Sequence, residues 1–146
     1  MESTDRITAL REANRVLRPG GLVLAFTITN YASTIVGITQ GWVWDNDYLS
    51  MCEGEITAGD HVRPASWPSL FSTAYFHHPR HIIHEIEESG FKCEGIFGIE
   101  GPGWMVPDFE ANWRNEERRE AILRIARQTE CDPVLSPHNM TVGRKQ

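Results

Sequence analysis

The stretch LREANRVLRPGGLVLAFTIT, residues 10–29, gives the strongest local signal in the chain. Apolar residues recur at helical spacing up to Leu17, and the Pro-Gly-Gly at 19–21 stops that helix, because proline cannot continue it and glycine accepts a tight reversal. Residues 22–26 form an unbroken apolar run, which predicts a strand buried on both faces, as in a parallel sheet. A helix, a short turn and a buried strand make half of a crossover unit, so we expect a doubly wound α/β fold.

Length and composition favour one globular domain. The chain has 146 residues, and we expect residues 1–146 to form a single domain. Hydrophobic content of 40% and charged content of 23% are typical of folded proteins. The net charge of −6 argues against nucleic-acid binding. The three cysteines form no CxxC pair, and no apolar run approaches the ~20 residues of a membrane span, so we expect a cytoplasmic protein without membrane contact.

The hydrophobic periodicity divides the domain into three parts. The first, residues 1–29, is the helix and the strand described above. The second, residues 30–68, carries two apolar stripes at helical spacing, which predict two short helices forming a lid or an association surface. Asn46 or Asp47 would cap the second of these helices. The third part comprises residues 69–146.

The third part contains the clearest helix of the chain, at residues 79–89. Pro79 suits the first helical position, and Gly90 suits the C-terminal cap. Alternation of side-chain type predicts a strand at 91–99. We also expect two helices capped by Asp108 and Asn115 and a final strand at 139–144.

Four segments carry a shared resemblance: RVLRPGGLVLAF at 15–26, TAYFHHP at 73–79, EESGF at 87–91 and GIEGPGWMVPDF at 98–109. Together they resemble the C-terminal half of class I S-adenosylmethionine-dependent methyltransferases, in which the first segment leads into the fifth strand. The resemblance covers most of the chain. It implies a partial Rossmann-like α/β fold, with a short mixed sheet of about three strands, flanking helices and a helical insertion.

The cofactor half of that family has no counterpart in this sequence. In the family, S-adenosylmethionine is bound by a glycine-rich turn after the first strand and by an acidic residue that closes the second strand. The resemblance therefore implies a methyltransferase that lacks its main cofactor-binding motif and acts on a small molecule. We expect the chain alone to bind S-adenosylmethionine weakly or not at all, with the missing half acting in trans. The alternative is a non-catalytic remnant that self-associates or binds a partner.

Substrate-side residues are expected where the predicted buried strand ends, because ligands of open α/β sheets bind beyond the carboxyl ends of strands. Asn30 and Tyr31 follow that strand, although helix capping and ordinary packing explain them equally well. No residue is assigned to catalysis, because the family relies largely on orientation and proximity. The candidates on the substrate side are Asn30, Tyr31, Tyr75, His77, Glu100 and Trp104.

The glycine-rich loop at 98–104 has two interpretations. It is not a dinucleotide fingerprint, since it follows the second recognisable strand and does not open a helix in a βαβ unit. A tight reversal that seats Trp104 against the core is favoured over a ligand-binding loop. The resemblance places this loop on the substrate side, which keeps Glu100 and Trp104 as candidates.

Histidines gather at positions 77, 78, 81 and 84, and the last three could share one helical face near Glu85. Histidine and carboxylate ligands at such spacings can bind a metal ion. Solvated or paired histidines are the commoner outcome on a helix surface, so we expect no metal site.

The resemblance also predicts self-association. In the family, the fifth strand lies between the fourth strand and the antiparallel seventh, and the fourth has no counterpart here. The strand at 21–29 should therefore present an unpaired apolar edge, which is a template for pairing with another chain. Helices at 4–18 and 79–89 would cover only one face of the sheet. We expect a homodimer through this edge and the helix at 35–44, burying more than about 2,000 Å².

Overall fold

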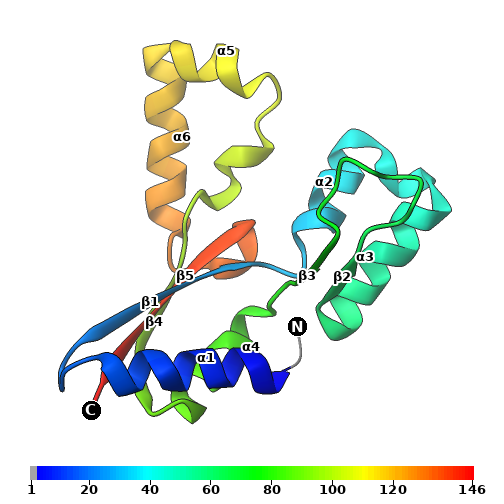
Figure 1. Cartoon of the computed structure of the whole chain (residues 1–146). Coiled ribbons are helices and arrows are strands. Elements are labelled where there is room, and N and C mark those ends of the chain that lie inside the picture. Colours follow the sequence, from blue (N-terminus) through cyan, green and yellow to red (C-terminus); the bar gives the residue numbers. More distant parts are fainter. Residues whose placement is uncertain (1–2) are drawn as a thin grey trace.

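The computed structural model describes residues 3–146 (Figure 1). Its main sheet has the strand order β1 (Leu22–Ile28), β5 (His138–Lys145) and β4 (Phe91–Gly98). Both pairings are antiparallel, with Leu24 opposite Val142 and Phe97 opposite Met140. The C-terminal strand β5 is therefore the central strand, and the fold is mixed α/β with a small antiparallel sheet.

Two helices cover one face of this sheet: α1 (Ser3–Val16) and α4 (Pro79–Glu88) (Figure 1). Pro79 occupies the first turn of α4, and Gly90 adopts φ +85° just after it, so the predicted helix signals act as expected. The core between helices and sheet is apolar. It consists of buried Ile82, Ile86 and Phe91, with Leu10, Ala13, Leu17, Val23, Ala25, Cys93 and Ile96 packed around them.

The opposite face of the sheet is open, so the prediction that residues 22–26 are buried on both faces is wrong. Leu22, Leu24 and Phe26 are 45%, 50% and 65% exposed, whereas Val23 and Ala25 reach the core. The expected mixed sheet is also corrected, since the pairings within it are antiparallel. An antiparallel sheet commonly packs helices on one face only, so a continuous apolar run supplies one inner and one outer stripe.

The outer edge of β1 is largely unpaired. Its end is closed by His77, whose N–H donates to the Ile28 carbonyl at 2.7 Å and whose carbonyl accepts from the N–H of Asn30 at 3.1 Å. This is a parallel bridge between Thr29 and His77. Within residues 3–146 no strand pairs with the rest of this edge, residues 22–27. The unpaired edge expected for the strand at 21–29 is therefore present.

A second lobe follows β1 and contains α2 (Ala32–Gln40), η1 (Trp42–Trp44), α3 (Asn46–Ala58), β2 (Asp60–Val62) and β3 (Thr73–Tyr75). The helix expected at 35–44 ends earlier, because Gly41 adopts φ +74° and a 3₁₀ turn follows it. Asp45, rather than Asn46 or Asp47, caps α3 by accepting from the N–H of Tyr48. The small antiparallel sheet of β2 and β3 was not predicted.

The third region is an arm formed by η2 (Gly101–Met105), α5 (Phe109–Arg114), α6 (Glu116–Thr129) and η3 (Pro133–Leu135). In Figure 1 the arm extends from the end of the sheet, away from α1 and α4. Asn115 caps α6 as predicted by accepting from the N–H of Arg118. Asp108 lies in the left-handed region at φ 47° and makes no capping hydrogen bond, so its predicted role is wrong.

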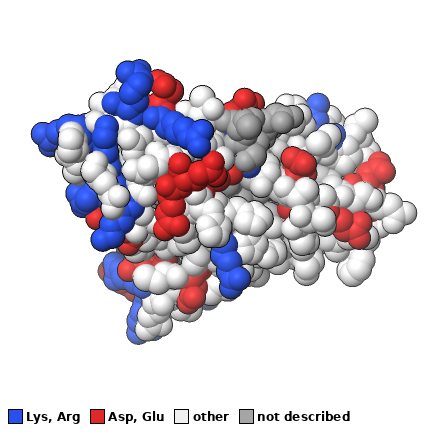
Figure 2. Space-filling view, turned by 90° about the horizontal axis from the view of Figure 1, so that it is seen from below, with Lys and Arg blue, Asp and Glu red and all other residues white. Residues whose placement is uncertain are grey.

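Lysine and arginine side chains gather at the end of the molecule where α1 leads into β1 (Figure 2). Lys145 closes the C-terminus of α1 by donating to the carbonyls of Asn14 at 2.6 Å and Leu17 at 2.9 Å. Arg144 pairs with Glu94 across the sheet.

Among the helices of residues 3–146, none has the length and apolar character needed to cross a membrane.

Candidate functional site

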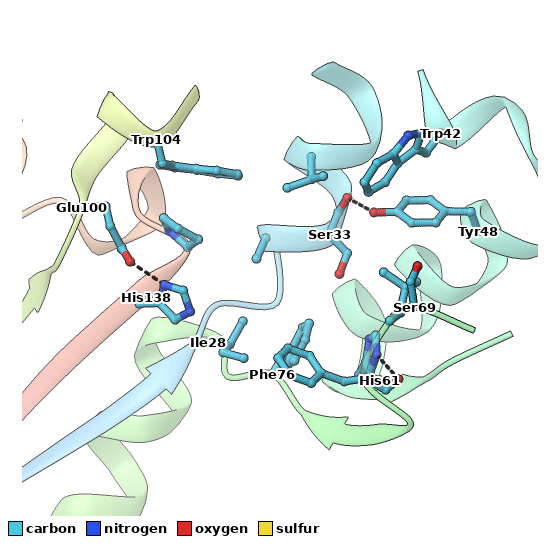
Figure 3. Close-up of a pocket in the computed structure, with 15 residues that line it drawn as sticks. Ile28, Ser33, Trp42, Tyr48, His61, Ser69, Phe76, Glu100, Trp104 and His138 are labelled. Atoms are coloured by element: carbon cyan, nitrogen blue, oxygen red, sulfur yellow. Dashed lines mark hydrogen bonds and ion pairs between the residues drawn. The ribbon is translucent and has the colours of Figure 1, made fainter. Parts of the chain in front are cut away.

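A cavity of about 500 Å³ lies beyond the end of β1, between the sheet and the lobe of α2 and α3 (Figure 3). Side chains from the start of the arm and from β5 form one wall, and side chains from α2, η1 and α3 form the other. This volume is within the range of small-molecule sites. The apolar part of the lining is Ile28, Val36, Trp42, Leu70, Phe76 and Trp104.

The sheet-side wall carries an imidazole and a carboxylate in direct contact. Nδ1 of His138 lies 2.6 Å from Oε1 of Glu100, and the two side chains are 48% and 35% exposed. The hydroxyl of Ser136 lies 3.0 Å from Oε2 of Glu100 and accepts from the backbone N–H groups of Glu100 and Gly101. Ser136 is fully buried, so it fixes both the backbone and the carboxylate of Glu100.

The opposite wall is backed by a buried pair, Glu55 and His61. Oε1 of Glu55 is 2.6 Å from Nδ1 of His61 and accepts from the hydroxyl of Ser33 at 3.0 Å. Burial raises the pKa of Glu55, although hydrogen bonds from His61 and Ser33 act in the opposite direction. Nε2 of His61 is 3.0 Å from the Phe71 carbonyl, so both ring nitrogens of this histidine are occupied.

Aromatic side chains define the shape of the cavity. The ring of His61 stacks on Phe76 with centroids 4.7 Å apart, and Trp42 meets Tyr48 edge-on at 5.6 Å. The indole ring of Trp104 reaches across from η2 toward α2 (Figure 3). Its N–H is buried without an acceptor among residues 3–146. The cavity therefore presents flat apolar surfaces suited to a planar ligand.

Glu100 and Trp104 are the two sequence-predicted candidates that line this cavity. Asn30 is buried beside it and donates to the Ile56 carbonyl at 3.3 Å, which joins the end of β1 to α3. Tyr31 makes an edge-on ring contact with His78 at 5.9 Å. These contacts give Asn30 and Tyr31 packing partners outside the cavity lining.

Tyr75, which is half-buried, and His77, which is buried, belong to a separate cluster that ties α1 to α4. The guanidinium of Arg6 lies 3.5 Å from the centre of the Tyr75 ring and donates to Glu85 through Nε and Nη2. Nε2 of His77 lies 3.2 Å from the second oxygen of Glu85. The structure thus places these two candidates together, but away from Glu100 and Trp104.

His138, Ser136 and His61 were missed by sequence reasoning. His138 and Glu100 are 38 residues apart, and the antiparallel pairing of β4 and β5 brings them together. No local pattern marks such a pair. Phe76 could have been found, since it lies inside the segment TAYFHHP at 73–79 that carries the resemblance.

The glycine-rich loop does not fit the role of a cofactor cradle. A Cβ added at Gly103 would lie 2.7 Å from Cγ2 of Ile122, and one at Gly101 would lie 3.0 Å from Oγ1 of Thr129. These glycines therefore allow close packing of the loop against α6. Within residues 3–146 no group of three His, Cys, Asp or Glu side chains is arranged to hold a metal ion.

No protein-family model matches this chain. No curated protein is significantly similar to it.

Proposed function

We propose that this chain is the acceptor-binding half of a class I S-adenosylmethionine-dependent methyltransferase and that its cavity holds an uncharged, largely apolar small molecule. One observation carries the proposal. Two of the resembling segments supply residues to the cavity: Phe76 comes from the segment at 73–79, and Glu100 and Trp104 come from the segment at 98–109. Ile28, the last residue of β1, follows the segment at 15–26 and also lines the cavity. Ligands of open α/β sheets bind in this position, beyond the ends of strands.

The strand arrangement is a second support. The fifth strand of the resembled fold has an antiparallel strand on one side, and β1 has antiparallel β5 on one side. The edge at 22–27, unpaired among residues 3–146, is where the fourth strand would lie. A cofactor half acting in trans would pair there, which gives the edge a role within the same proposal.

The composition of the lining favours a neutral ligand. The net charge of the chain is −6, and Glu100 contributes a carboxylate to the wall, so entry of a ligand that is already anionic would be disfavoured. Trp42, Phe76 and Trp104 offer aromatic surface. Catalysis in this class of enzyme depends on holding the acceptor in one orientation, which a rigid aromatic cavity supplies.

Cofactor binding by the chain alone is expected to be weak. The 146 residues supply neither the glycine-rich turn nor the ribose-binding acid of the family, and the loop at 98–104 is packed against α6. Titration calorimetry with S-adenosylmethionine and S-adenosylhomocysteine should show no saturation at micromolar concentrations. A low micromolar dissociation constant would contradict this division of roles.

Acceptor binding is tested by filling the cavity. Val36 lines it, whereas Ile38 is on the same helix, is 62% exposed and is not part of the lining. Val36→Phe should weaken the binding of simple phenols, followed by tryptophan fluorescence, by at least tenfold, and Ile38→Phe should leave it unchanged. Equal effects of the two substitutions, or no binding by the native chain, would refute the proposed acceptor site.

Self-association is a second candidate function, and the open sheet face favours it. Leu22, Leu24 and Phe26 form an exposed apolar stripe on β1. Soluble monomers rarely leave such a surface uncovered over a wide area. The stripe and the cavity are formed by different residues, so self-association leaves the cavity free. A dimer that also covers the edge at 22–27 would compete with a cofactor half for that edge.

A further inference from the structure

The imidazole of His138 is the cavity-lining group with an unengaged proton acceptor. Its Nδ1 faces the Glu100 carboxylate at 2.6 Å, and a carboxylate accepts, so in the neutral form of the ring the proton lies on Nδ1 and the lone pair on Nε2. No residue between 3 and 146 bonds to Nε2. Figure 3 shows this nitrogen on the side of the ring away from Glu100 and toward the cavity.

The orientation of this pair is fixed by Ser136. The serine hydroxyl accepts from two backbone N–H groups and lies within donating distance of both Oε2 of Glu100, at 3.0 Å, and the His138 carbonyl, at 2.8 Å. Since Ser136 is fully buried, these contacts are shielded from water. Glu100 is thereby held as the positioning residue for the imidazole.

The other titratable groups of the cavity are already occupied. The hydroxyl of Tyr48 donates to the Ser33 carbonyl at 2.9 Å, and burial, with smaller effects of Cys52 and Glu55, raises the pKa of Tyr48. His61 is bonded through Nδ1 to Glu55 and through Nε2 to a backbone carbonyl. Among the histidine and tyrosine side chains that line the cavity, His138 is the one with a ring nitrogen, Nε2, that makes no hydrogen bond within residues 3–146.

We propose that His138 and Glu100 deprotonate the hydroxyl of a phenol bound in the cavity. The inference rests on the proposed acceptor site and names its substrate class. The O–H bond breaks, its electron pair stays on the phenol oxygen, and the proton moves to Nε2. The product is a phenolate beside an imidazolium that donates from Nδ1 to the Glu100 carboxylate, with no change in total charge.

The acidity of the hydroxyl selects phenols over aliphatic alcohols. A phenol ionises near pH ~10, whereas an aliphatic alcohol, like water, ionises only at a much higher pH. An imidazole supported by one carboxylate can take a proton from the first group far more readily than from the second. The aromatic lining from Phe76 and Trp104 also suits the ring of a phenol.

The test uses 4-nitrophenol, because its phenolate absorbs visible light and so reports ionisation without any enzymatic turnover. Binding is measured by quenching of tryptophan fluorescence, and the ionised fraction of bound probe by absorbance as a function of pH. In the native chain the ionisation midpoint of the bound probe should lie at least about one pH unit below that of the free probe. His138→Gln should return it to the free value or higher, with binding of the neutral probe changed less than about threefold.

Two further variants sharpen the result. Glu100→Gln should raise the midpoint partly, because the imidazole loses its negative partner. His84→Gln, a change at an exposed histidine of α4, should leave it unaffected. A native chain that binds the probe with an unchanged midpoint, or a lowered midpoint that survives His138→Gln, would overturn the inference and leave the acceptor cavity intact. A native chain that does not bind the probe would overturn both.

Discussion

Two buried glutamates illustrate how single residues are accommodated in this fold. Burial raises the pKa of Glu85, but hydrogen bonds from His77 and Arg6 lower it by more, so the net pKa lies below its usual range. For Glu55, burial outweighs the hydrogen bonds from His61 and Ser33, and the net pKa lies above its usual range. The difference is the guanidinium of Arg6, a permanent positive charge that Glu55 lacks.

Glu85→Gln should destabilise the chain by about 3 kcal/mol at neutral pH, because it leaves the guanidinium of Arg6 buried beside a neutral amide. Glu88→Gln is the matched control on the same helix. Its ion pair with Arg11 is 57% exposed on both sides, so the loss should stay below about 1 kcal/mol. Urea unfolding measures both, and equal losses would contradict the assigned role of Glu85.

The same substitution predicts a change in pH dependence. Because the pKa of Glu85 is lowered on folding, its contribution is present above the unfolded-state value of about 4.3 and is lost as the pH falls through the folded-state value. The difference in unfolding free energy between the native chain and Glu85→Gln should therefore become smaller as the pH falls from about 5 to about 3. This range surrounds the reference pKa of a glutamate. A constant difference would be inconsistent with a lowered pKa.

At the scale of elements, local signals identified most helices and strands. Pro79, Gly90 and Asn115 act through the chain next to them, so their effects could be predicted from sequence. The exposure of one face of β1 could not be predicted, because an apolar run does not reveal how many layers pack on it. Nor could the β2–β3 pairing, since each strand has only three residues.

The packing of α2 on α3 requires a glycine at position 37. A Cβ at Gly37 would lie 2.5 Å from Cε1 of Tyr48 and 2.8 Å from Cγ1 of Val43, so Gly37→Ala should destabilise by about 1–3 kcal/mol. Gly54, inside α3, has only the Asp60 carbonyl within contact, at 3.6 Å. Gly54→Ala should stabilise by about 0.5–1 kcal/mol through helix propensity. Denaturant midpoints that shift in the same direction would contradict this packing.

At the scale of the whole molecule, the accessible surface area is larger than that of a compact monomer of the same mass. The accessible area is 8956 Å², whereas a compact monomer of 16.6 kDa exposes about 7,600 Å². The excess arises from the open arrangement of sheet, lobe and arm seen in Figure 1. It is comparable to the area that each protomer would bury in a stable dimer.

We therefore expect a homodimer that covers the open face and edge of β1 and buries more than about 2,000 Å² in total. Sedimentation equilibrium at low micromolar concentration should give twice the chain mass, and Leu24→Lys should give the monomer. Leu24 is half exposed and points away from the core, so the protomer should fold normally. Val62→Lys, on the exposed surface of β2, is the control and should remain dimeric. A native monomer would contradict the interface.

The candidate site was only partly predictable because it is assembled from distant segments. Glu100 and Trp104 were found through the resemblance of the loop at 98–104. His138 was not, since its position beside Glu100 depends on the β4–β5 pairing. Tyr75 and His77 lie in the segment at 73–79 beside Phe76. Successive side chains of an extended segment point to opposite sides, so Tyr75 and His77 point away from the cavity that Phe76 lines.

The central claim is that the cavity beyond β1 binds a neutral aromatic hydroxyl compound. The most direct measurement is a ¹H–¹⁵N NMR titration of the native chain with phenol. Saturable shifts are expected at the backbone amides of four residues that line the cavity: Ser33, Glu100, Trp104 and His138. Shifts confined to Leu24, Phe26 and Met140 on the open sheet face, or no saturable shifts, would contradict it.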